Sequence, residues 1–431
     1  MVDSSTKLRS RLIRWKKPMV AFLLGQPSVQ LLSLITGFCL IRWLTVDQFA
    51  MFGIALAFQA TVNQLVDLGF TGSIVALAGS EGKNPNVLGG YVRSARYWRT
   101  KFQIVVLVGA AIAFWLITWH QPWPPLIKVL LFGSVALGVF FQGWTMYGAP
   151  LLVNRSLQKY YSPKIQGAVL RFSFCAALYA TGFLSAWAAA LLSTLSLGYT
   201  GLCYRHSSRS YINEPEQSVP GYNVEMWRYL TPLMPGLVFG ALQSQILIGL
   251  IAIFGSSQNI AEVTALGRVG QIFLMLGAFN AVFIEPYIAS VSRSLLPRRY
   301  LQIFSAALCI SVAVGIVGFA FPKPLLWLMG DKYSDLAQEI GWVVLTACLS
   351  YMGGVMWTMH SARKWVFWWG TAAYISVLVV TQIVCIATLD LSQTLSVVWF
   401  GVITSAVVLV VHAATAAYGF SIQPSPHPSS P

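Results

Sequence analysis

The side chains best suited to chemistry in this chain are polar residues inside apolar stretches. Gln59, Asn63 and Asp67 recur at every fourth position, and a helix would place all three on one face. Arg268 and Gln271 lie one turn apart in a later stretch, where a guanidinium and an amide could contact an anion such as phosphate. Because polar groups are expensive in hydrocarbon, we expect them to face protein or a water-filled cavity.

Each of these groups also has a purely structural interpretation. The stripe from Gln59 to Asp67 could line a cavity, or it could form hydrogen bonds between helices. Arg268 could bind an anion or pair with Glu262. Glu285, which precedes a proline that should kink its helix, could bind and release protons or pair with Arg293. The residue patterns leave these alternatives open.

Arg42 is a further candidate binding residue. It ends the first apolar stretch, and a cation is favoured at a helix C-terminus in any case. The few histidines and the six cysteines show no metal-ligand spacing. The chain also lacks H-E-x-x-H, G-x-S-x-G and phosphate-loop motifs. We therefore expect no enzyme activity, no metal site and no cofactor.

Composition indicates a membrane protein. Hydrophobic residues make up 56% of the 431 residues, charged residues only 10%, and the mean hydropathy is +0.67, whereas a soluble domain is about a quarter charged. The net charge of +15 would suggest nucleic acid in a soluble protein. Here the basic residues separate apolar stretches, so membrane topology explains them and no nucleic-acid partner is expected.

The apolar stretches predict about twelve transmembrane helices, since each span needs roughly 20 residues. The expected spans are 18–41, 48–70, 102–120, 126–149, 165–181, 184–203, 229–254, 260–290, 302–321, 338–360, 366–387 and 394–417. The fifth and sixth are so close together that the sequence leaves open whether they form one helix or two. The basic, aromatic stretch Val87 to Thr100 is expected to lie along the membrane surface before the third span.

The distribution of basic residues predicts the orientation. Most Lys and Arg residues fall in alternate connecting segments, which the positive-inside rule places in the cytoplasm. Arg99 and Arg171 are grouped with these inner residues, and Arg268 is the one basic residue assigned to the interior of a span. Both termini are then cytoplasmic, in a multi-pass protein of a bacterial inner membrane.

The longest inner segment between spans divides the chain into two halves of six helices. The expected organisation is a basic cytoplasmic segment (1–17), a first lobe (18–204), a cytoplasmic loop (205–228), a second lobe (229–417) and a disordered tail (418–431). Matching basic segments and prolines suggest a parallel repeat, and such transporters bind their substrate between the halves.

Short motifs resemble the polysaccharide-biosynthesis, or O-antigen (Wzx-type), flippases of the multidrug/oligosaccharidyl-lipid/polysaccharide (MOP) exporter superfamily. The matching residues are Leu31 to Phe38, Arg42-Trp43-Leu44, Asp47, Asp67 to Phe70, Ala265 to Arg268, Pro286 and Gly330 to Tyr333. Glycines of the family pattern are lost at Thr45 and Ala50. Many relatives have an acidic residue in the seventh span where this chain has Gln245, which puts an ion-coupling carboxylate at that site in doubt.

The resemblance implies an all-helical bundle of two lobes around a central cavity. It also implies alternating-access transport of an undecaprenyl-pyrophosphate-linked oligosaccharide to the periplasmic leaflet, for surface polysaccharide such as lipopolysaccharide. Arg268, Gln271, Arg42, Gln59 and Asn63 would contact this substrate. H⁺ or Na⁺ could couple at Asp67 or Glu285, and a polymerase or glycosyltransferase could be a partner. The alternatives are a drug/cation antiporter of the same superfamily and a membrane-embedded glycosyltransferase or polymerase.

Overall fold

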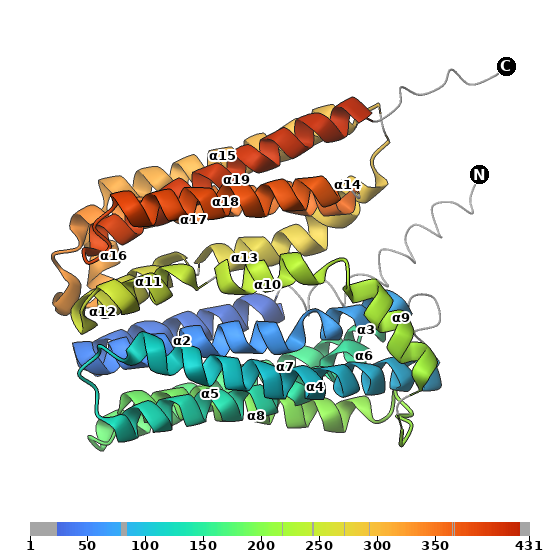
Figure 1. The fold of residues 1–431 in the computed structure, drawn as a ribbon, viewed down its shortest axis with the longest axis horizontal. Helices are drawn as coiled ribbons and strands as arrows, with labels where there is room; N and C mark the ends of the chain where they lie inside the picture. The colour runs from blue at the N-terminus through green and yellow to red at the C-terminus, as the bar shows by residue number, and fades with distance from the viewer. Residues whose placement is uncertain are drawn as a thin grey trace. The chain divides into compact units, whose positions relative to one another are not determined.

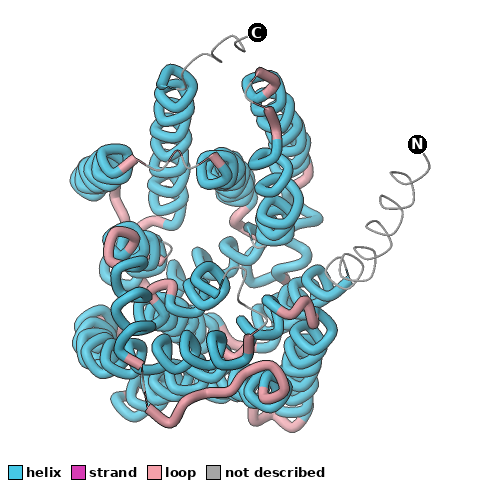
Figure 2. Tube along the Cα trace, turned by 90° about the vertical axis from the view of Figure 1, so that its right-hand side faces the viewer, coloured by secondary structure: helices cyan, strands magenta, loops and turns pink. Residues whose placement is uncertain are grey.

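The computed structural model describes residues 24–78, 84–217, 219–243, 245–270, 272–292, 294–363, 365 and 367–422. Within these ranges the regular structure is helical and contains no strand (Figure 2). The basic N-terminal segment and the end of the C-terminal tail lie outside the described residues, as do Gln271 and Arg293. The expectation of an all-helical membrane protein is confirmed.

The chain divides into two compact units, residues 1–249 and 250–431. The described part of the first unit begins with the helix Leu24–Trp43. Its other helices, shown from blue to green in Figure 1, are α2 (Val46–Asp67), α3 (Phe70–Ala78), α4 (Pro85–Thr118), α5 (Pro125–Thr145), α6 (Gly148–Val153), α7 (Leu157–Ala180), α8 (Ala186–Ser208), α9 (Pro220–Leu230), α10 (Met234–Gln243) and the start of α11 (Ile246–Phe254).

The second unit contains the rest of α11 and a span broken into short pieces. These are α12 (Ser257–Gly270), α13 (Ile272–Phe279), the π-helix η2 (Asn280–Ile284) and α14 (Glu285–Ser290). Longer helices follow: α15 (Leu296–Ala320), α16 (Pro322–Met329), the 3₁₀ turn η3 (Asp331–Tyr333), α17 (Ala337–Ala362), α18 (Trp368–Thr388) and α19 (Thr394–Ile422). The sequence-based lobe boundaries remain a prediction, because the division between the units falls within α11.

Among the described residues, nine helices are long and apolar enough to cross a membrane, or ten if the bent pair α10 and α11 forms one span. Helix α7 and the broken helices α12 to α14 correspond to the other two expected spans, and both carry charged residues. The fifth and sixth spans are separate helices. Gly182, with φ +76°, forms the turn between them, and Ser185 caps α8 through the Ala188 amide.

The third span differs from its expected form. The stretch Val87 to Thr100 does not lie apart from it on the membrane surface but continues into it, so α4 is one helix of 34 residues. Pro85 starts the helix, and the Asn84 side chain accepts a hydrogen bond from the Asn86 amide. Glycine and small residues in this first part allow other segments to approach closely, which favours a packed helix over a surface helix.

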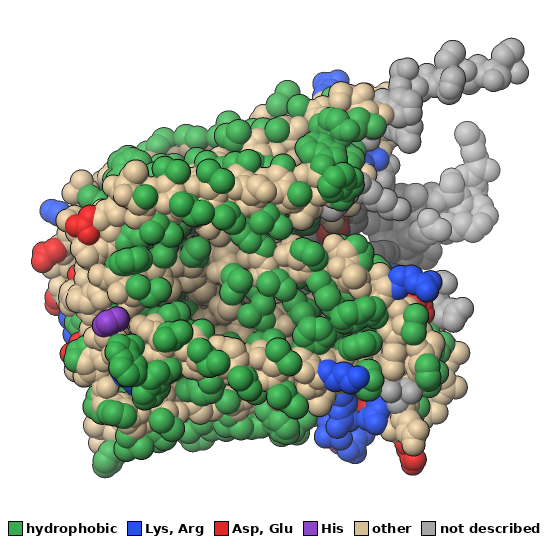
Figure 3. All heavy atoms as spheres, viewed as in Figure 1, with side chains coloured by type: hydrophobic (Ala, Val, Ile, Leu, Met, Phe, Trp, Pro, Cys, Tyr) green, Lys and Arg blue, Asp and Glu red, His purple; other side chains and the backbone are tan. Residues whose placement is uncertain are grey.

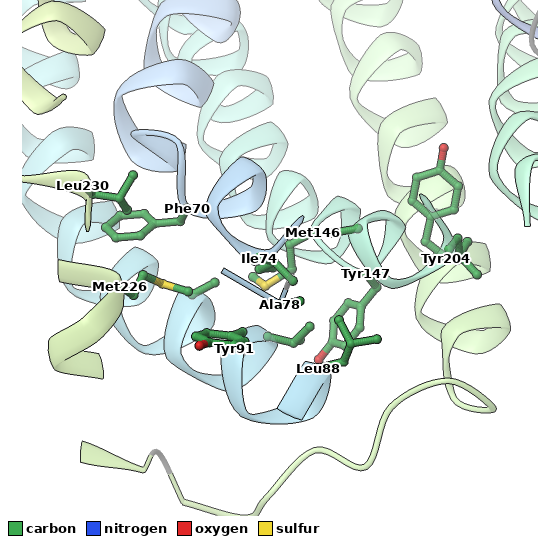
Figure 4. Close-up of a cluster of buried hydrophobic side chains, with 14 of the residues drawn as sticks. Phe70, Ile74, Ala78, Leu88, Tyr91, Met146, Tyr147, Tyr204, Met226 and Leu230 are labelled. Atoms are coloured by element: carbon green, nitrogen blue, oxygen red, sulfur yellow. The ribbon is translucent and has the colours of Figure 1, made fainter. Parts of the chain in front are cut away.

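The N-terminal part of α4 packs into a hydrophobic cluster with the connecting segments (Figure 4). Phe70, Ile74 and Ala78 of α3, Leu88 and Tyr91 of α4, Met146 and Tyr147 after α5, Tyr204 of α8, and Met226 and Leu230 of α9 all contribute to it. The segment between α8 and α9 is therefore held against the first unit rather than forming a free linker.

Two glycines allow this docking. The Asn213 amide donates to the Pro85 carbonyl (2.9 Å), and a Cβ on Gly89 would overlap the Asn213 carbonyl oxygen. A Cβ on Gly90 would overlap the Tyr222 ring of α9. The Tyr91 hydroxyl donates to Glu225 (2.7 Å). These hydrogen bonds and close contacts hold the segment between α8 and α9, and α9 itself, at the N-terminal end of α4.

Each unit repeats one packing scheme. In the first, α2 packs on α5 and α8, and α5 packs on α8; in the second, α12 packs on α17 and α19, and α17 packs on α19. The same pairing of equivalent spans is what a parallel repeat requires. Apolar side chains cover the middle of the face in Figure 3, and charged side chains gather toward its ends, as expected for helices in lipid.

Candidate functional site

Gln59, the first residue of the polar stripe on α2, contacts two other helices. Its Nε2 donates to the Thr194 hydroxyl of α8 (2.8 Å), and Thr194 donates to the Ser134 carbonyl of α5 (3.1 Å). Gly138 of α5 leaves room for the amide, because a Cβ there would overlap Gln59 Nε2. The contacts at Gln59 match the interhelical interpretation of the stripe.

Asp67 ends α2 in an ion pair with a nearly buried arginine. Its Oδ1 lies 3.1 Å from Arg99 Nη1 of α4 and accepts a hydrogen bond from the Thr71 hydroxyl (2.5 Å). Arg99 Nη2 also donates to the Val139 carbonyl of α5 (3.3 Å). The Arg99 side chain is only 3% exposed, so it is packed within the first unit; its assignment to the cytoplasmic side from the charge pattern stays a prediction.

Asn63, the middle residue of the stripe, and Arg42, on the preceding helix, occupy different environments from Gln59 and Asp67. The Asn63 Oδ1 is buried and has no hydrogen-bond partner among the described residues, which leaves it able to accept a hydrogen bond from a ligand. Arg42 is exposed near the end of the helix Leu24–Trp43. Since α2 extends roughly 33 Å from its start beside that helix end, Arg42 and Asp67 lie at opposite ends of it.

In the second unit, Arg268 is half-buried near the end of α12, and Gln271 lies outside the described residues. Glu262, the proposed structural partner of Arg268, accepts hydrogen bonds from the Thr394 hydroxyl and from Gln258 Nε2 (2.7 Å). Outside the spans, burial and the Glu262 charge raise the pKa of the Tyr333 phenol. These contacts tie α12 to α19 and leave the role of Arg268 open.

Glu285 lies where the eighth span changes geometry. The π-helix η2 ends at Ile284, and Glu285 is the first residue of α14, where it is half-buried. Asn280, at the start of η2, is 2% exposed, and its Oδ1 has no hydrogen-bond partner among the described residues. Such single-turn π segments inside helices are frequent at functional sites.

The sequence-based candidates omit one residue, Arg171. It lies within α7, and its Nε is buried without a hydrogen-bond partner. The charge pattern groups it with the inner basic residues, and that assignment stays a prediction. A signal was nevertheless present, because position 171 falls inside the span expected at 165–181.

The chain provides no metal site within its described residues, where no group of three or more His, Cys, Asp or Glu side chains could hold an ion. No family model and no curated protein sequence matches it. Solved structures do match, over nearly the full length of both chains.

The similar structures are membrane transporters. An inward-facing multidrug resistance MATE family transporter of the MOP superfamily matches with a TM-score of 0.67 and 15% identity, covering 91% of this chain and 94% of that one. The lipid II flippase MurJ, in an inward closed conformation, matches with a TM-score of 0.69 and 11% identity, over 93% and 87%. This chain has the fold of the MOP transporters.

A third similar structure is informative for the site. It is a MOP superfamily transporter from Pyrococcus furiosus described as having a binding pocket of reverse polarity (TM-score 0.64, 14% identity, 94% and 95% coverage). Proteins of this fold thus differ in the polarity of their pockets. The similar structures are described as transporters and as a flippase.

Proposed function

We propose that this protein is a flippase that moves an undecaprenyl-pyrophosphate-linked oligosaccharide from the cytoplasmic to the periplasmic leaflet of a bacterial inner membrane, by alternating access. Surface polysaccharide biosynthesis, such as that of O-antigen, would use the product. Both termini would be cytoplasmic, and a polymerase or glycosyltransferase would act beside it. The Wzx-type motifs support this assignment at the level of the subfamily.

The observation that carries the proposal is the combination of the MOP fold, shared with a lipid II flippase over most of the chain, with spans that contain arginines. These include Arg171 in the middle of α7 and Arg268 in the last turn of α12. An anionic pyrophosphate headgroup is favoured by arginine, whose planar guanidinium can contact two oxygens at once. A cationic drug would instead favour carboxylates.

In this proposal the headgroup contacts Arg268, Gln271, Arg42, Gln59 and Asn63 during transport, while the polyprenyl tail remains in lipid. A proton or Na⁺ couples through Asp67 or Glu285. Asp67 already pairs with Arg99 (3.1 Å), so coupling at this position requires the pair to open, and protonation of the carboxylate would weaken it.

The test is deletion of the gene in its native host, complemented with the wild type or with Arg268→Ala. We expect the deletion to abolish the surface glycan and to trap its complete lipid-linked precursor in the cytoplasmic leaflet. Wild type should restore both, and Arg268→Ala should not, at equal protein level. A truncated precursor would indicate an enzyme instead.

The similarity to MATE transporters also supports a second candidate, a drug/cation antiporter. The same deletion strain distinguishes the two functions. An intact glycan together with increased sensitivity to cationic drugs would favour the antiporter and contradict the flippase.

A further inference from the structure

Two histidine side chains meet in the second unit. His360 lies in the last turn of α17 and is 1% exposed, and His412 of α19 is half-buried. The centres of their rings are 5.6 Å apart. The proposed transport mechanism does not use this pair, although histidine is the side chain whose charge changes most readily near neutral pH.

The pair joins three helices. The Nε2 atom of His360 forms a hydrogen bond of 3.0 Å with the Tyr300 hydroxyl of α15. The His412 ring packs on Gly353 of α17, where a Cβ atom would lie 3.7 Å from His412 Cδ2. Since α17 packs on both α15 and α19, the two imidazoles form part of the contact that holds these three helices together.

Uncharged aromatic rings surround both imidazoles. Four of them lie with their centroids 5.9–6.2 Å from a histidine ring: Tyr300 and Trp365 beside His360, and Trp357 and Tyr374 beside His412. Gly419 of α19 makes room for one of these rings, because a Cβ atom there would overlap the Trp365 indole. The surroundings of the pair are therefore closely packed and offer a charge few hydrogen-bond acceptors.

The charged residues close to the pair in sequence are basic. On α15, Arg298 and Arg299 precede Tyr300. Arg363 follows the last turn of α17 and donates to a backbone carbonyl at the end of α14. Helices α18 and α19 contain no Lys, Arg, Asp or Glu. A positive charge on either imidazole would therefore have like charges, rather than a counter-ion, on the elements around it.

Carboxylates of the second unit lie elsewhere on the helices that pack here. Glu339 begins α17 about 32 Å before His360, and Glu262 binds the first residue of α19 about 27 Å before His412. Glu285 is half-buried at the start of α14, which packs on α17. Neither imidazole forms an ion pair or hydrogen bond with a carboxylate among the described residues.

The hydrogen bonding of His360 suits a neutral ring. Its Nδ1 atom is buried and has no hydrogen-bond partner among the described residues. A neutral imidazole can leave one nitrogen as a bare acceptor while the other shares the hydrogen bond with Tyr300, whereas an imidazolium carries N–H groups on both nitrogens. Protonation would thus place both a charge and an unpaired donor inside the packed cluster, which is unfavourable.

We propose that His360 and His412 form an acid-sensitive contact within the second unit. While both rings are neutral, they hold α17 against α15 and α19; protonation of either ring favours a second packing of these helices in which the ring is hydrated. A local protonation that changes the balance between two packings is a common form of pH sensing. The inference depends neither on the transported substrate nor on Asp67 or Glu285.

Linkage between protonation and packing gives the size of the effect. A hydrated histidine has a pKa of about 6.5, so at about pH 5.5 it is protonated roughly ten times more often than it is neutral. Each ring then favours the hydrated packing about tenfold over its balance at about pH 7.5, and the two rings together about a hundredfold. The contact is therefore fully formed above about pH 6.5 and weakens as the pH falls below it.

The experiment uses the purified full-length chain with His360→Gln, His412→Gln, the double variant and a control, His206→Gln. His206 is exposed on α8, so its replacement removes a histidine that water already reaches. The melting temperature of each protein is measured at about pH 7.5 and about pH 5.5. In parallel, the ring signals of ¹³C-labelled histidines are titrated by NMR and assigned from the signal that each single variant lacks.

We expect acidification to lower the melting temperature of the wild type and of His206→Gln by about 3 °C more than that of the double variant. Each single variant should show about half of this difference, so the test stands even where the double variant does not fold. The His360 and His412 signals should still be those of neutral rings at the pH where His206 is half protonated.

Two results would overturn the proposal. If the variants melt at lower temperatures at both pH values but keep the wild-type dependence on pH, the imidazoles only fill space between the helices. If the His360 and His412 signals titrate together with that of His206, protonation does not disturb the contact. Both measurements use the protein without substrate, so neither result depends on whether deletion of the gene confirms or contradicts the flippase assignment.

Discussion

Two arginines in the first unit present the same side chain to very different surroundings. Where α2 ends, Arg99 pairs with Asp67 (3.1 Å) and donates to the Val139 carbonyl (3.3 Å). In the middle of α7, Arg171 has neither a carboxylate nor a carbonyl acceptor among the described residues. The first arginine is paired within the fold, whereas the second forms no hydrogen bond or ion pair with the described residues.

This difference shows that burial alone does not distinguish a structural charge from a functional one. Arg99 is the more buried of the two, yet its contacts join α2, α4 and α5 and explain its presence. Arg171 is less buried, and among the described residues it has no such contacts. The predictions below test this contrast through stability.

The largest effect is expected at the satisfied arginine. Arg99→Met removes the cation that pairs with the Asp67 carboxylate. We expect the free energy of unfolding to fall by about 3 kcal/mol, because the carboxylate is left without its partner. The measurement is reversible unfolding in mixed detergent, with Arg171→Met as the matched comparison. The double variant Arg99→Met/Asp67→Asn should recover part of the loss. An Arg99→Met variant as stable as the wild type would contradict the structural role of Arg99.

A smaller effect on stability is expected where the segment between α8 and α9 packs on α4. Gly89→Val would force a side chain into the Asn213 carbonyl and should cost about 2 kcal/mol, as overpacking usually does. Limited proteolysis should then cut the segment between α8 and α9 faster than in the wild type. Gly109→Val, in the same helix but with open space around it, is the control; equal proteolysis of the two variants would argue against docking.

The smallest effect concerns the polar stripe. A double-mutant cycle of Gln59→Leu and Thr194→Val should give a coupling of about 0.6 kcal/mol, the average for hydrogen bonds between helices in membranes. A coupling near zero, together with loss of transport in Gln59→Leu alone, would shift Gln59 from a helix contact to a substrate contact.

Much of the fold was predictable because lipid imposes simple rules on sequence. The length of each apolar stretch predicted the transmembrane helices, and the spacing of Gln59, Asn63 and Asp67 predicted a shared helix face. The continuous helix through Arg99 was not predicted, because basic and aromatic residues are equally typical of a membrane surface. Whether Gln59 lines a cavity or joins helices was open for a similar reason, since both roles need a polar residue on the same face.

By itself, the sequence determined that this chain is helical and lies in a membrane, since hydrocarbon requires long apolar helices whose backbone groups bond internally. Only the tertiary structure decided which polar groups satisfy one another. Asp67 and Arg99 are far apart in sequence and meet because α2 packs on α4, whereas Arg171 meets no carboxylate among the described residues. Partnership between buried charges depends on which helices pack together, and that is a property of the whole fold rather than of any local pattern.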